Sequence, residues 1–213
     1  MSNTTPTLGQ GPVQRPAGRA LRRALPTLLL VAVLLPVLVV GALRVQRRGE
    51  ATGTAGFTVA DQEAVEADVP HRVVEVKGLL LADGSPWSSV SARGSLLVVN
   101  FWASWCGPCR AEQPELSRVA RAYRDRGVRF VGVNVRDSRS AADSYVEEFK
   151  IPYPSLYDQA ALQAARLQAF ALPSTFVLDR DGVVAYRLTG KTTMPILSAR
   201  LERLLAQGGR WVG

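Results

Sequence analysis

Hydrophobic and polar positions divide the chain into an apolar stretch near the N-terminus, a polar connecting stretch and a long region of alternating short elements. Residues 25–43 carry no charge, and nearly all of them are apolar. At about 1.5 Å per residue, a helix over this stretch would reach roughly 28 Å, close to the bilayer's hydrocarbon thickness of about 30 Å. The pattern predicts a transmembrane anchor, with a cleavable secretory signal as the alternative. We favour the anchor because the stretch exceeds the usual signal core and no A-x-A-like site follows it.

Basic residues flank this predicted anchor on both sides. Residues 1–24 form a basic N-terminal tail with four arginines and no acid, and residues 44–48 contain three more arginines. The difference slightly favours a cytoplasmic N-terminus, which would place everything after residue 48 outside the cell membrane. Residues 44–70 mix Gly, Ala, Thr and acids with scattered apolar positions, so we expect them to form a tether.

The remaining region, residues 71–213, fits one domain in which strands and helices alternate. Residues 96–102 form a short apolar run, which is typical of a strand buried on both faces of a parallel sheet. A helical pattern follows to about Arg126 and ends at Gly127, and residues 128–135 form a second apolar run. This order predicts a strand–helix–strand unit in an α/β fold.

Further elements are expected on both sides of this unit. An opening strand is predicted over residues 71–81, before a turn at Asp83-Gly84. Three helices are predicted over residues 140–150, 159–170 and 195–206, and a hairpin joins strands over 175–178 and 183–188. The strands of a hairpin run antiparallel, so the central sheet should be mixed.

The net charge of +8 is concentrated at the N-terminus. From Gly49 onward, nineteen Lys and Arg face eighteen Asp and Glu, so the predicted domain is nearly neutral. The basic isoelectric point is therefore no sign of nucleic-acid binding. A hydrophobic content of 47% also excludes a disordered chain.

Both cysteines of the chain lie where the first predicted buried strand meets its helix, as Cys106-Gly107-Pro108-Cys109. A structural zinc site needs four nitrogen or sulfur ligands, but the chain has two cysteines and one histidine, so we expect no metal. Covalent haem attachment needs His directly after the second cysteine, where this chain has Arg110. A purely structural disulfide closing so small a loop would restrain the unfolded chain little. The motif therefore indicates thiol–disulfide chemistry without a cofactor.

The position of the motif at a helix start suggests a role for each residue. The sulfur of Cys106 should face unpaired backbone N–H groups and the positive end of the helix dipole, which stabilise a thiolate. We therefore expect Cys106 to be the attacking nucleophile and Cys109, one turn further, to be the resolving thiol. Gly107 allows close backbone approach, and Pro108 occupies the first turn, where its missing N–H costs nothing. Trp105 directly precedes the nucleophile, so we expect it to border the substrate groove.

Two separated motifs resemble the thioredoxin superfamily. The run Asn-Phe-Trp-Ala-Ser-Trp-Cys-Gly-Pro-Cys-Arg at residues 100–110 resembles the thioredoxin active-site segment, and its continuation at 112–116 is similar to the TlpA/ResA-like branch. Leu172-Pro173 resembles the cis-proline loop, in which the proline faces the cysteine pair and the preceding residue's backbone pairs with the substrate peptide. The resemblance covers about residues 70–206. It implies a thioredoxin fold with an inserted helix at 140–150 and an N-terminal anchor.

TlpA/ResA-like proteins are membrane-anchored thiol:disulfide oxidoreductases that act outside the cytoplasmic membrane. The resemblance implies that this chain reduces protein disulfides, and it points to cytochrome c maturation. The substrate would then be the C-x-x-C-H disulfide of an apocytochrome c, and the electron donor a membrane thiol protein. A thiol peroxidase is one alternative, although position 103 is Ala where a Thr-x-x-Cys motif would need Thr. A general disulfide reductase or isomerase, and a non-enzymatic binding module with this fold, are the others.

Glu112 is the candidate for handling the proton of Cys109. Thioredoxins, which the segment resembles, usually carry a buried Asp at the strand position that is Asn100 here. Apolar and reactive positions recur at three- and four-residue spacing along the helix, which places Glu112 on its inward stripe. Burial should raise the pKa of Glu112 into the range useful for general acid–base work on the resolving thiol. The alternative is a capping or salt-bridge role near the helix start.

Overall fold

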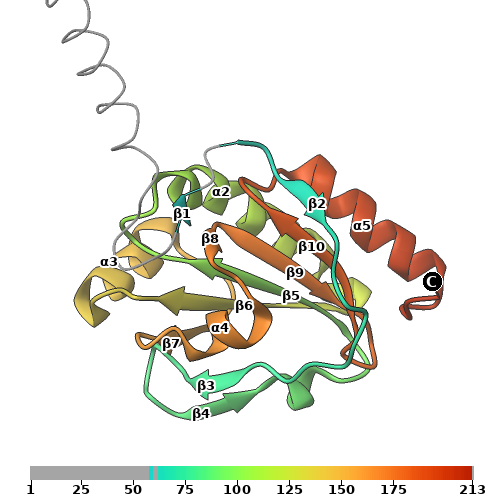
Figure 1. Ribbon diagram of the computed structural model, residues 1–213, viewed down its shortest axis with the longest axis horizontal. Coiled ribbons are helices and arrows are strands. Elements are labelled where there is room, and N and C mark those ends of the chain that lie inside the picture. Colours follow the sequence, from blue (N-terminus) through green and yellow to red (C-terminus); the bar gives the residue numbers. More distant parts are fainter. Residues whose placement is uncertain (1–57, 60–61, 213) are drawn as a thin grey trace, which may run out of the picture. The chain divides into compact units, whose positions relative to one another are not determined.

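The computed structural model describes residues 58–59 and 62–212. A mixed sheet of six strands, in the order β2-β10-β9-β5-β6-β7, forms the centre of this part of the chain (Figure 1). The strands are β2 (Val65–Ala67), β10 (Val184–Thr189), β9 (Ser174–Leu178), β5 (Leu96–Trp102), β6 (Val128–Val135) and β7 (Ser155–Asp158). β5, β6 and β7 run parallel, whereas β9 is antiparallel to β5 and to β10. The predicted mixed sheet is therefore confirmed.

Two shorter strand pairs and the helices surround this sheet. β3 (Lys77–Leu79) pairs antiparallel with β4 (Pro86–Ser88), and β1 (Thr58–Val59) pairs parallel with β8 (Ala171–Leu172). The α-helices are α2 (Gly107–Tyr123), α3 (Arg139–Phe149), α4 (Leu162–Leu167) and α5 (Met194–Ala206). Two 3-10 helices, η1 (Ser89–Ala92) and η2 (Arg124–Arg126), complete the described elements.

The centre of the sheet is apolar because β5 and β6 are covered on both faces. All seven residues of β5 are buried, and Arg129 is the exposed residue of β6. Leu96 and Val98 of β5 share a core with α2 and α5, whereas Leu97 and Val99 share a second core with α3 and α4. Side chains alternate along a strand, which explains why one strand supplies both cores. The strands predicted over 96–102 and 128–135 are thus confirmed.

The remaining predicted elements agree with the structure except in their extents. The hairpin predicted over 175–178 and 183–188 corresponds to β9 and β10, and the helices predicted over 140–150 and 195–206 correspond to α3 and α5. The helix predicted over 159–170 is too long, because α4 ends where Gln168 adopts a left-handed conformation with φ of 56°. The opening strand predicted over 71–81 contracts to β3.

The tether predicted over residues 44–70 differs from the structure at its C-terminal end. Val65–Ala67 form the edge strand β2, which pairs with Arg187–Thr189 of β10. Val69 is buried in the core that faces α3 and α4. Backbone pairing at a sheet edge needs no strong apolar pattern, so three mostly exposed residues can form this strand without a clear sequence signal.

The predicted tail (residues 1–24) and anchor (residues 25–43) lie outside the described residues. Within residues 58–59 and 62–212, no helix is both long enough and apolar enough to cross a membrane.

Candidate redox site

A disulfide joins Cys106 and Cys109 at the start of α2. Cys106 is the N-cap residue of the helix, and its sulfur accepts the backbone N–H of Cys109 at 3.2 Å. Both side chains are almost completely buried. A sulfur atom that accepts an N–H group at a helix N-terminus lies where negative charge is stabilised, so this position favours a thiolate on reduction.

The two residues between the cysteines form the first turn of α2. Pro108 is buried there, at a position that has no intrahelical acceptor for a backbone N–H. A Cβ atom added to Gly107 would meet no atom within 4 Å in the described structure. The fold itself therefore leaves room for a side chain at position 107, and the expected benefit of glycine concerns only a molecule that approaches from outside.

Asp137, which the sequence analysis missed, holds the loop that precedes Cys106. Asp137 follows β6, and its carboxylate accepts hydrogen bonds from the backbone N–H and the hydroxyl of Ser104 at 2.6 and 2.9 Å. Asn134 and the backbone of Ser138 also donate to it, each at 2.9 Å. The carboxyl ends of parallel strands share one edge of the sheet, where functional groups of such folds gather. A polar residue just after the second buried strand was therefore the available sequence signal.

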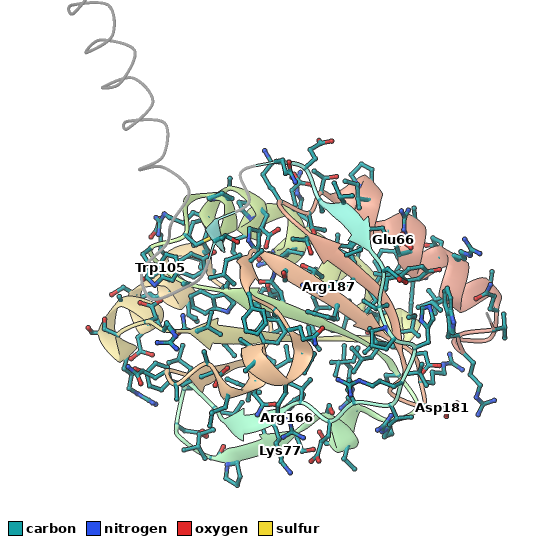
Figure 2. All side chains as sticks on the ribbon, viewed as in Figure 1. Glu66, Lys77, Trp105, Arg166, Asp181 and Arg187 are labelled. Atoms are coloured by element: carbon teal, nitrogen blue, oxygen red, sulfur yellow. A yellow bond between two sulfur atoms is a disulfide. The ribbon has the colours of Figure 1, made fainter. Side chains whose placement is uncertain are left out.

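Trp105 lies at the same end of the sheet and is partly exposed (Figure 2). Its indole N–H donates to the carbonyl oxygen of Arg136 at 3.0 Å. The loop after β6 thus holds Trp105 through Arg136 and Ser104 through Asp137. Both contacts fix the two residues that immediately precede Cys106.

Pro173 lies at the end of the sheet that carries the disulfide. The Leu172–Pro173 peptide bond is cis. Phe101 near the end of β5 pairs with Ser174 at the start of β9. Because the two strands are antiparallel, Pro173, which precedes Ser174, lies at the end of the sheet where β5 leads toward Cys106. Leu172 is buried in the same apolar cluster as both cysteines. The structure therefore brings together the two motifs that resemble thioredoxins.

Glu112 is buried on the inward side of α2, one turn beyond Cys109, as the helical spacing predicts. Its Oε1 accepts a hydrogen bond from the side-chain amide of Asn100 at 2.8 Å, and its Oε2 accepts the backbone N–H of Thr192 at 2.7 Å. Burial raises the pKa of Glu112 to about 8, although both hydrogen bonds act in the opposite direction. This carboxyl group can therefore exchange a proton near neutral pH.

Tyr145 of α3 is a second residue that the sequence analysis missed. Its hydroxyl donates to the backbone carbonyl oxygen of Cys109 at 2.9 Å. Its ring stacks on Trp102 of β5, with the ring centroids 4.3 Å apart. The inserted helix expected over 140–150 thus contacts the first turn of α2 directly.

Among the described residues, no three His, Cys, Asp or Glu side chains gather closely enough to hold a metal ion.

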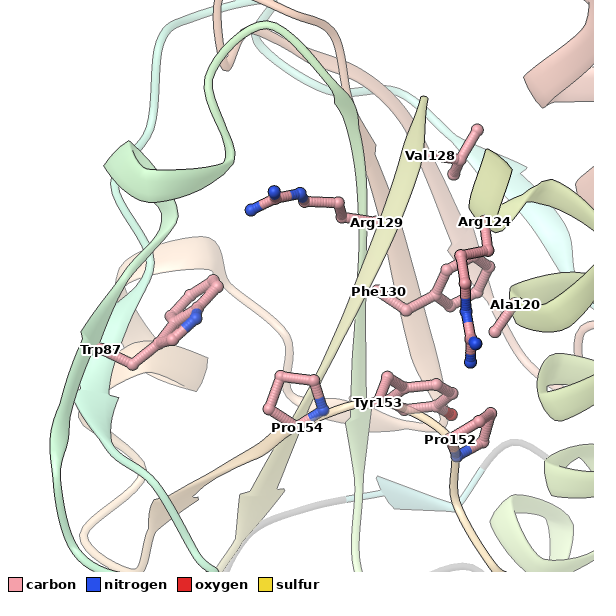
Figure 3. A pocket seen from close by; sticks show the side chains of 9 residues that line it. All are labelled: Trp87, Ala120, Arg124, Val128, Arg129, Phe130, Pro152, Tyr153 and Pro154. Carbon is pink, nitrogen blue, oxygen red and sulfur yellow. The ribbon is translucent and has the colours of Figure 1, made fainter. Parts of the chain in front are cut away.

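An open hollow of about 360 Å³ is lined by nine residues (Figure 3). Three of its lining residues, Val128, Arg129 and Phe130, start β6, whereas Cys106 follows the carboxyl end of the parallel strand β5. The other lining residues are Trp87, Ala120, Arg124, Pro152, Tyr153 and Pro154. The hollow and the disulfide are therefore at opposite ends of the parallel strands.

The described residues form a thioredoxin fold in which a Cys-x-x-Cys disulfide starts the helix after the first parallel strand, at the end of the sheet that also carries a cis-proline. These features define the class of thioredoxin-like thiol-disulfide oxidoreductases.

Comparison with known proteins agrees. The AhpC/TSA family matches residues 66–187. The thiol:disulfide interchange protein DsbE of Allochromatium vinosum is 33% identical over 120 residues, which cover 55% of this chain and 65% of that protein, just under two thirds. The thiol-disulfide oxidoreductase ResA of Bacillus cereus is 26% identical over 162 residues, which cover 71% of this chain and 89% of that protein. The chain belongs to the AhpC/TSA family.

A solved structure supports the same assignment. A DsbF homologue from Corynebacterium diphtheriae, known from a crystal structure, has 30% sequence identity to this chain, and the two structures superpose with a TM-score of 0.60. The match covers 72% of this chain and 97% of that one. The resemblance to ResA-like thiol-disulfide oxidoreductases is thus confirmed.

Proposed function

We propose that the protein is an extracytoplasmic thiol:disulfide oxidoreductase that mainly reduces protein disulfides. The placement of Cys106 carries this proposal, because its sulfur caps α2 and accepts the N–H of Cys109. That environment lowers the energy of the thiolate relative to the thiol. The names of the relatives, a thiol:disulfide interchange protein and a thiol-disulfide oxidoreductase, agree with this chemistry.

The first step is attack by Cys106. In the reduced protein, the Cys106 thiolate attacks one sulfur of the substrate disulfide, a new S–S bond forms, and the other substrate sulfur leaves as a thiolate. The backbone of Leu172, next to Pro173, pairs with the substrate chain, and Trp105 borders it. Gly107 leaves the surface at the start of α2 open to the approaching chain, and Pro108 forms the first turn behind it.

Cys109 then resolves the mixed disulfide. Glu112 accepts the proton of the Cys109 thiol when its own carboxyl group is ionised, a fraction that grows as pH approaches its pKa of about 8. The resulting Cys109 thiolate attacks the sulfur of Cys106. This attack forms the Cys106–Cys109 disulfide and releases the second substrate thiolate, which takes up a proton. Two electrons have passed to the substrate. A dithiol protein of the membrane then reduces Cys106–Cys109 by the same exchange in reverse.

The cellular setting is also part of the proposal. Residues 25–43 anchor the chain in the cell membrane as a single span, with the catalytic domain on the extracytoplasmic side. The charge-free apolar stretch between two arginine groups supports this arrangement. The resemblance to the TlpA/ResA-like branch supports an apocytochrome c disulfide as substrate and a role in cytochrome c maturation.

A thiol peroxidase would use Cys106 against a hydroperoxide instead. Ala103 is buried in the core beside both cysteines and lacks the hydroxyl that a Thr-x-x-Cys motif would supply. This observation favours the disulfide reductase over the peroxidase.

Trapping in the full-length protein tests the proposal. With Cys109→Ala, resolution is blocked, so the mixed disulfide at Cys106 should persist and identify its partner by mass. Cys106→Ala is the matched control, because it removes the attacking sulfur and should trap nothing. If Cys109→Ala captures no protein in oxidising cells, the proposed function fails. Turnover of insulin disulfides by the unmodified protein separates an enzyme from a binding module that keeps the fold.

A further inference from the structure

The chain places one of its own segments on the backbone edge next to the cis-proline. Thr58–Val59 (β1) pairs in parallel with Ala171–Leu172 (β8). The backbone N–H of Thr58 donates to the carbonyl oxygen of Phe170 at 3.1 Å. β8 leads directly into Pro173, so this pairing covers the backbone immediately before the cis peptide bond.

This edge is close to the redox centre. β8 pairs with β1 and stands outside the six-stranded sheet, although Pro173 and β9 follow it directly. Figure 1 shows β1 and β8 at the end of the sheet where β5 leads into α2. Leu172 belongs to the same buried cluster as Cys106. A chain that reaches Cys106 and pairs with β8 would therefore compete with β1 for one set of backbone groups.

Residues 62–64 bind through their backbone to the loop after β10. The N–H of Lys191 donates to the carbonyl oxygen of Gln62 at 2.8 Å, and the N–H of Ala64 donates back to Lys191 at 2.9 Å. Gly190 adopts φ of +107°, and a Cβ added there would come within 2.7 Å of the Gln62 carbonyl oxygen. The contact is therefore too close for any other residue without a shift of the backbone.

The same loop also contacts both parts of the active site. The N–H of Gly190 donates to the carbonyl oxygen of Pro173 at 3.0 Å. Two residues later, the N–H of Thr192 donates to Glu112 at 2.7 Å. The point at which residues 62–64 attach is thus part of the framework that holds Pro173 and Glu112.

We propose that Thr58–Val59, the strap, is an intramolecular competitor for the β8 edge and lowers the affinity for extended polypeptide substrates. This inference rests on the proposed reduction of protein disulfides. Two paired residues bind weakly by themselves, but only two residues separate the strap from its attachment at Gln62. The strap therefore acts at a high effective concentration. A polypeptide substrate adds a strand at β8 by displacing the strap, whereas a small disulfide needs no strand pairing.

A backbone substitution in the full-length protein tests the strap. Thr58→Pro removes the N–H that bonds to Phe170, whereas Thr58→Val keeps that N–H and the β-branched shape. The Thr58 side chain is exposed, so neither change disturbs a core. We expect Thr58→Pro to lower the KM for a disulfide-bonded extended peptide about three- to tenfold with little change in kcat, because the competent state becomes more populated. Thr58→Val should behave like the unmodified protein.

Reduction of 2-hydroxyethyl disulfide is the internal reference. All three proteins should reduce it at equal rates. An unchanged or higher KM for the peptide in Thr58→Pro, with normal rates on the small disulfide, would overturn the strap. If the unmodified protein reduces neither compound, the proposed reductase function fails instead.

Amide hydrogen exchange tests the strap without turnover and without altering its sequence. The mixed disulfide between the Cys109→Ala variant and a thiopyridyl-activated extended peptide can be prepared chemically. The Thr58 amide should be protected in the free protein and should lose that protection once the peptide is bound at Cys106. Equal protection in both states would show that the peptide and the strap occupy different places, which contradicts the proposal.

Discussion

Asn100 in β5 donates its side-chain amide to Oε1 of Glu112 at 2.8 Å and so joins the central strand to α2. The same amide donates to the hydroxyl of Thr175 in β9 at 3.1 Å. Asn100 and Glu112 are both buried. An amide does not titrate near neutral pH, so Glu112 is the group in this contact that can hold or release a proton.

Replacing Glu112 by Gln should slow the resolution of the mixed disulfide. Glu112→Gln keeps the shape and one of the two accepted hydrogen bonds, from Asn100 or from Thr192, but removes the titration. Cys109 therefore loses its proton acceptor. General acid–base groups contribute about 10²- to 10⁴-fold to rates, and we expect a loss at the lower end of that range, together with an altered pKa of Cys109. Stopped-flow measurement of mixed-disulfide decay from pH 6 to 9 checks the rate.

Glu147→Gln is the matched control for this substitution. Glu147 is exposed on α3, so the same chemical change there should leave resolution unchanged. Thiol titration and turnover that do not differ between Glu112→Gln and the unmodified protein across this pH range would exclude a proton-transfer role for Glu112.

The raised pKa of Glu112 also predicts how stability depends on pH. In the folded protein the pKa is about 8, against an ordinary value of 4.5, so the folded state keeps a proton that the unfolded state releases. The free energy of unfolding should therefore fall as pH rises from about 4.5 to about 8, at about 1.4 kcal/mol for each pKa unit between the two states. Urea unfolding at several pH values should show a smaller fall for Glu112→Gln. Parallel curves for the two proteins would contradict the raised pKa.

Asp137→Asn should weaken both the fold and the active-site loop. The substitution turns one of two accepting oxygens into a donor. In place of Oδ2 this donor faces the backbone N–H of Ser104 and the Asn134 amide, and in place of Oδ1 it faces the backbone N–H of Ser138. We expect the free energy of unfolding to fall by about 1 to 3 kcal/mol, as for other lost hydrogen bonds to a buried charged group. Denaturant unfolding measures this loss, and Asp143→Asn on the exposed side of α3 is the control. Equal stability of the two variants would show that Asp137 does not hold the loop.

Local sequence patterns carried much of the information about the site. Cys106, Cys109 and Glu112 share one helix, so their spacing along the chain sets their relative positions. Asp137 and Tyr145 contact the active-site segment across 33 and 36 residues of sequence. Such contacts depend on how strands and helices pack. The position of Asp137 just after a buried strand marks it as a candidate, but no local pattern specifies which residues Asp137 and Tyr145 contact.

The same distinction holds for the strands. β5 and β6 were predictable because strands buried on both faces need long apolar runs. β7 has only four residues, including Ser155 and Asp158, and is a strand because it pairs with β6. β2 likewise depends on its pairing with β10. Short strands at the sheet edges are therefore determined by their partners more than by their own sequences.

Gly132 in β6 should tolerate no side chain. A Cβ atom there would come within 2.4 Å of the Ser155 hydroxyl and within 2.6 Å of the indole nitrogen of Trp102, which stacks on Tyr145. We expect Gly132→Ala to lower the free energy of unfolding by about 1 to 3 kcal/mol, as overpacked cores do. Gly78→Ala is the control, because a Cβ there meets Leu156 at an ordinary 3.7 Å. Similar denaturation curves for both variants would refute the crowding at Gly132.

The last prediction concerns the redox potential. The Gly107-Pro108 dipeptide places no cation between the cysteines to stabilise the thiolate of the reduced form further. We expect a reducing couple, nearer about −270 mV than about −120 mV, measured by equilibration with glutathione. A value above about −180 mV would instead indicate a disulfide donor or isomerase.

A cation introduced at position 107 tests the physical reason for that potential. A Cβ on Gly107 meets nothing within 4 Å, so Gly107→Lys and Gly107→Gln should both fold normally. The Lys ammonium would stabilise the Cys106 thiolate and hence the reduced form, so the potential of the Lys variant should be more positive than that of the Gln variant by about 5 to 20 mV. The difference should shrink at high salt, which screens an exposed charge. Identical potentials would mean that the charge beside Cys106 does not set the redox poise, and that the low value has its origin elsewhere in the buried surroundings of the disulfide.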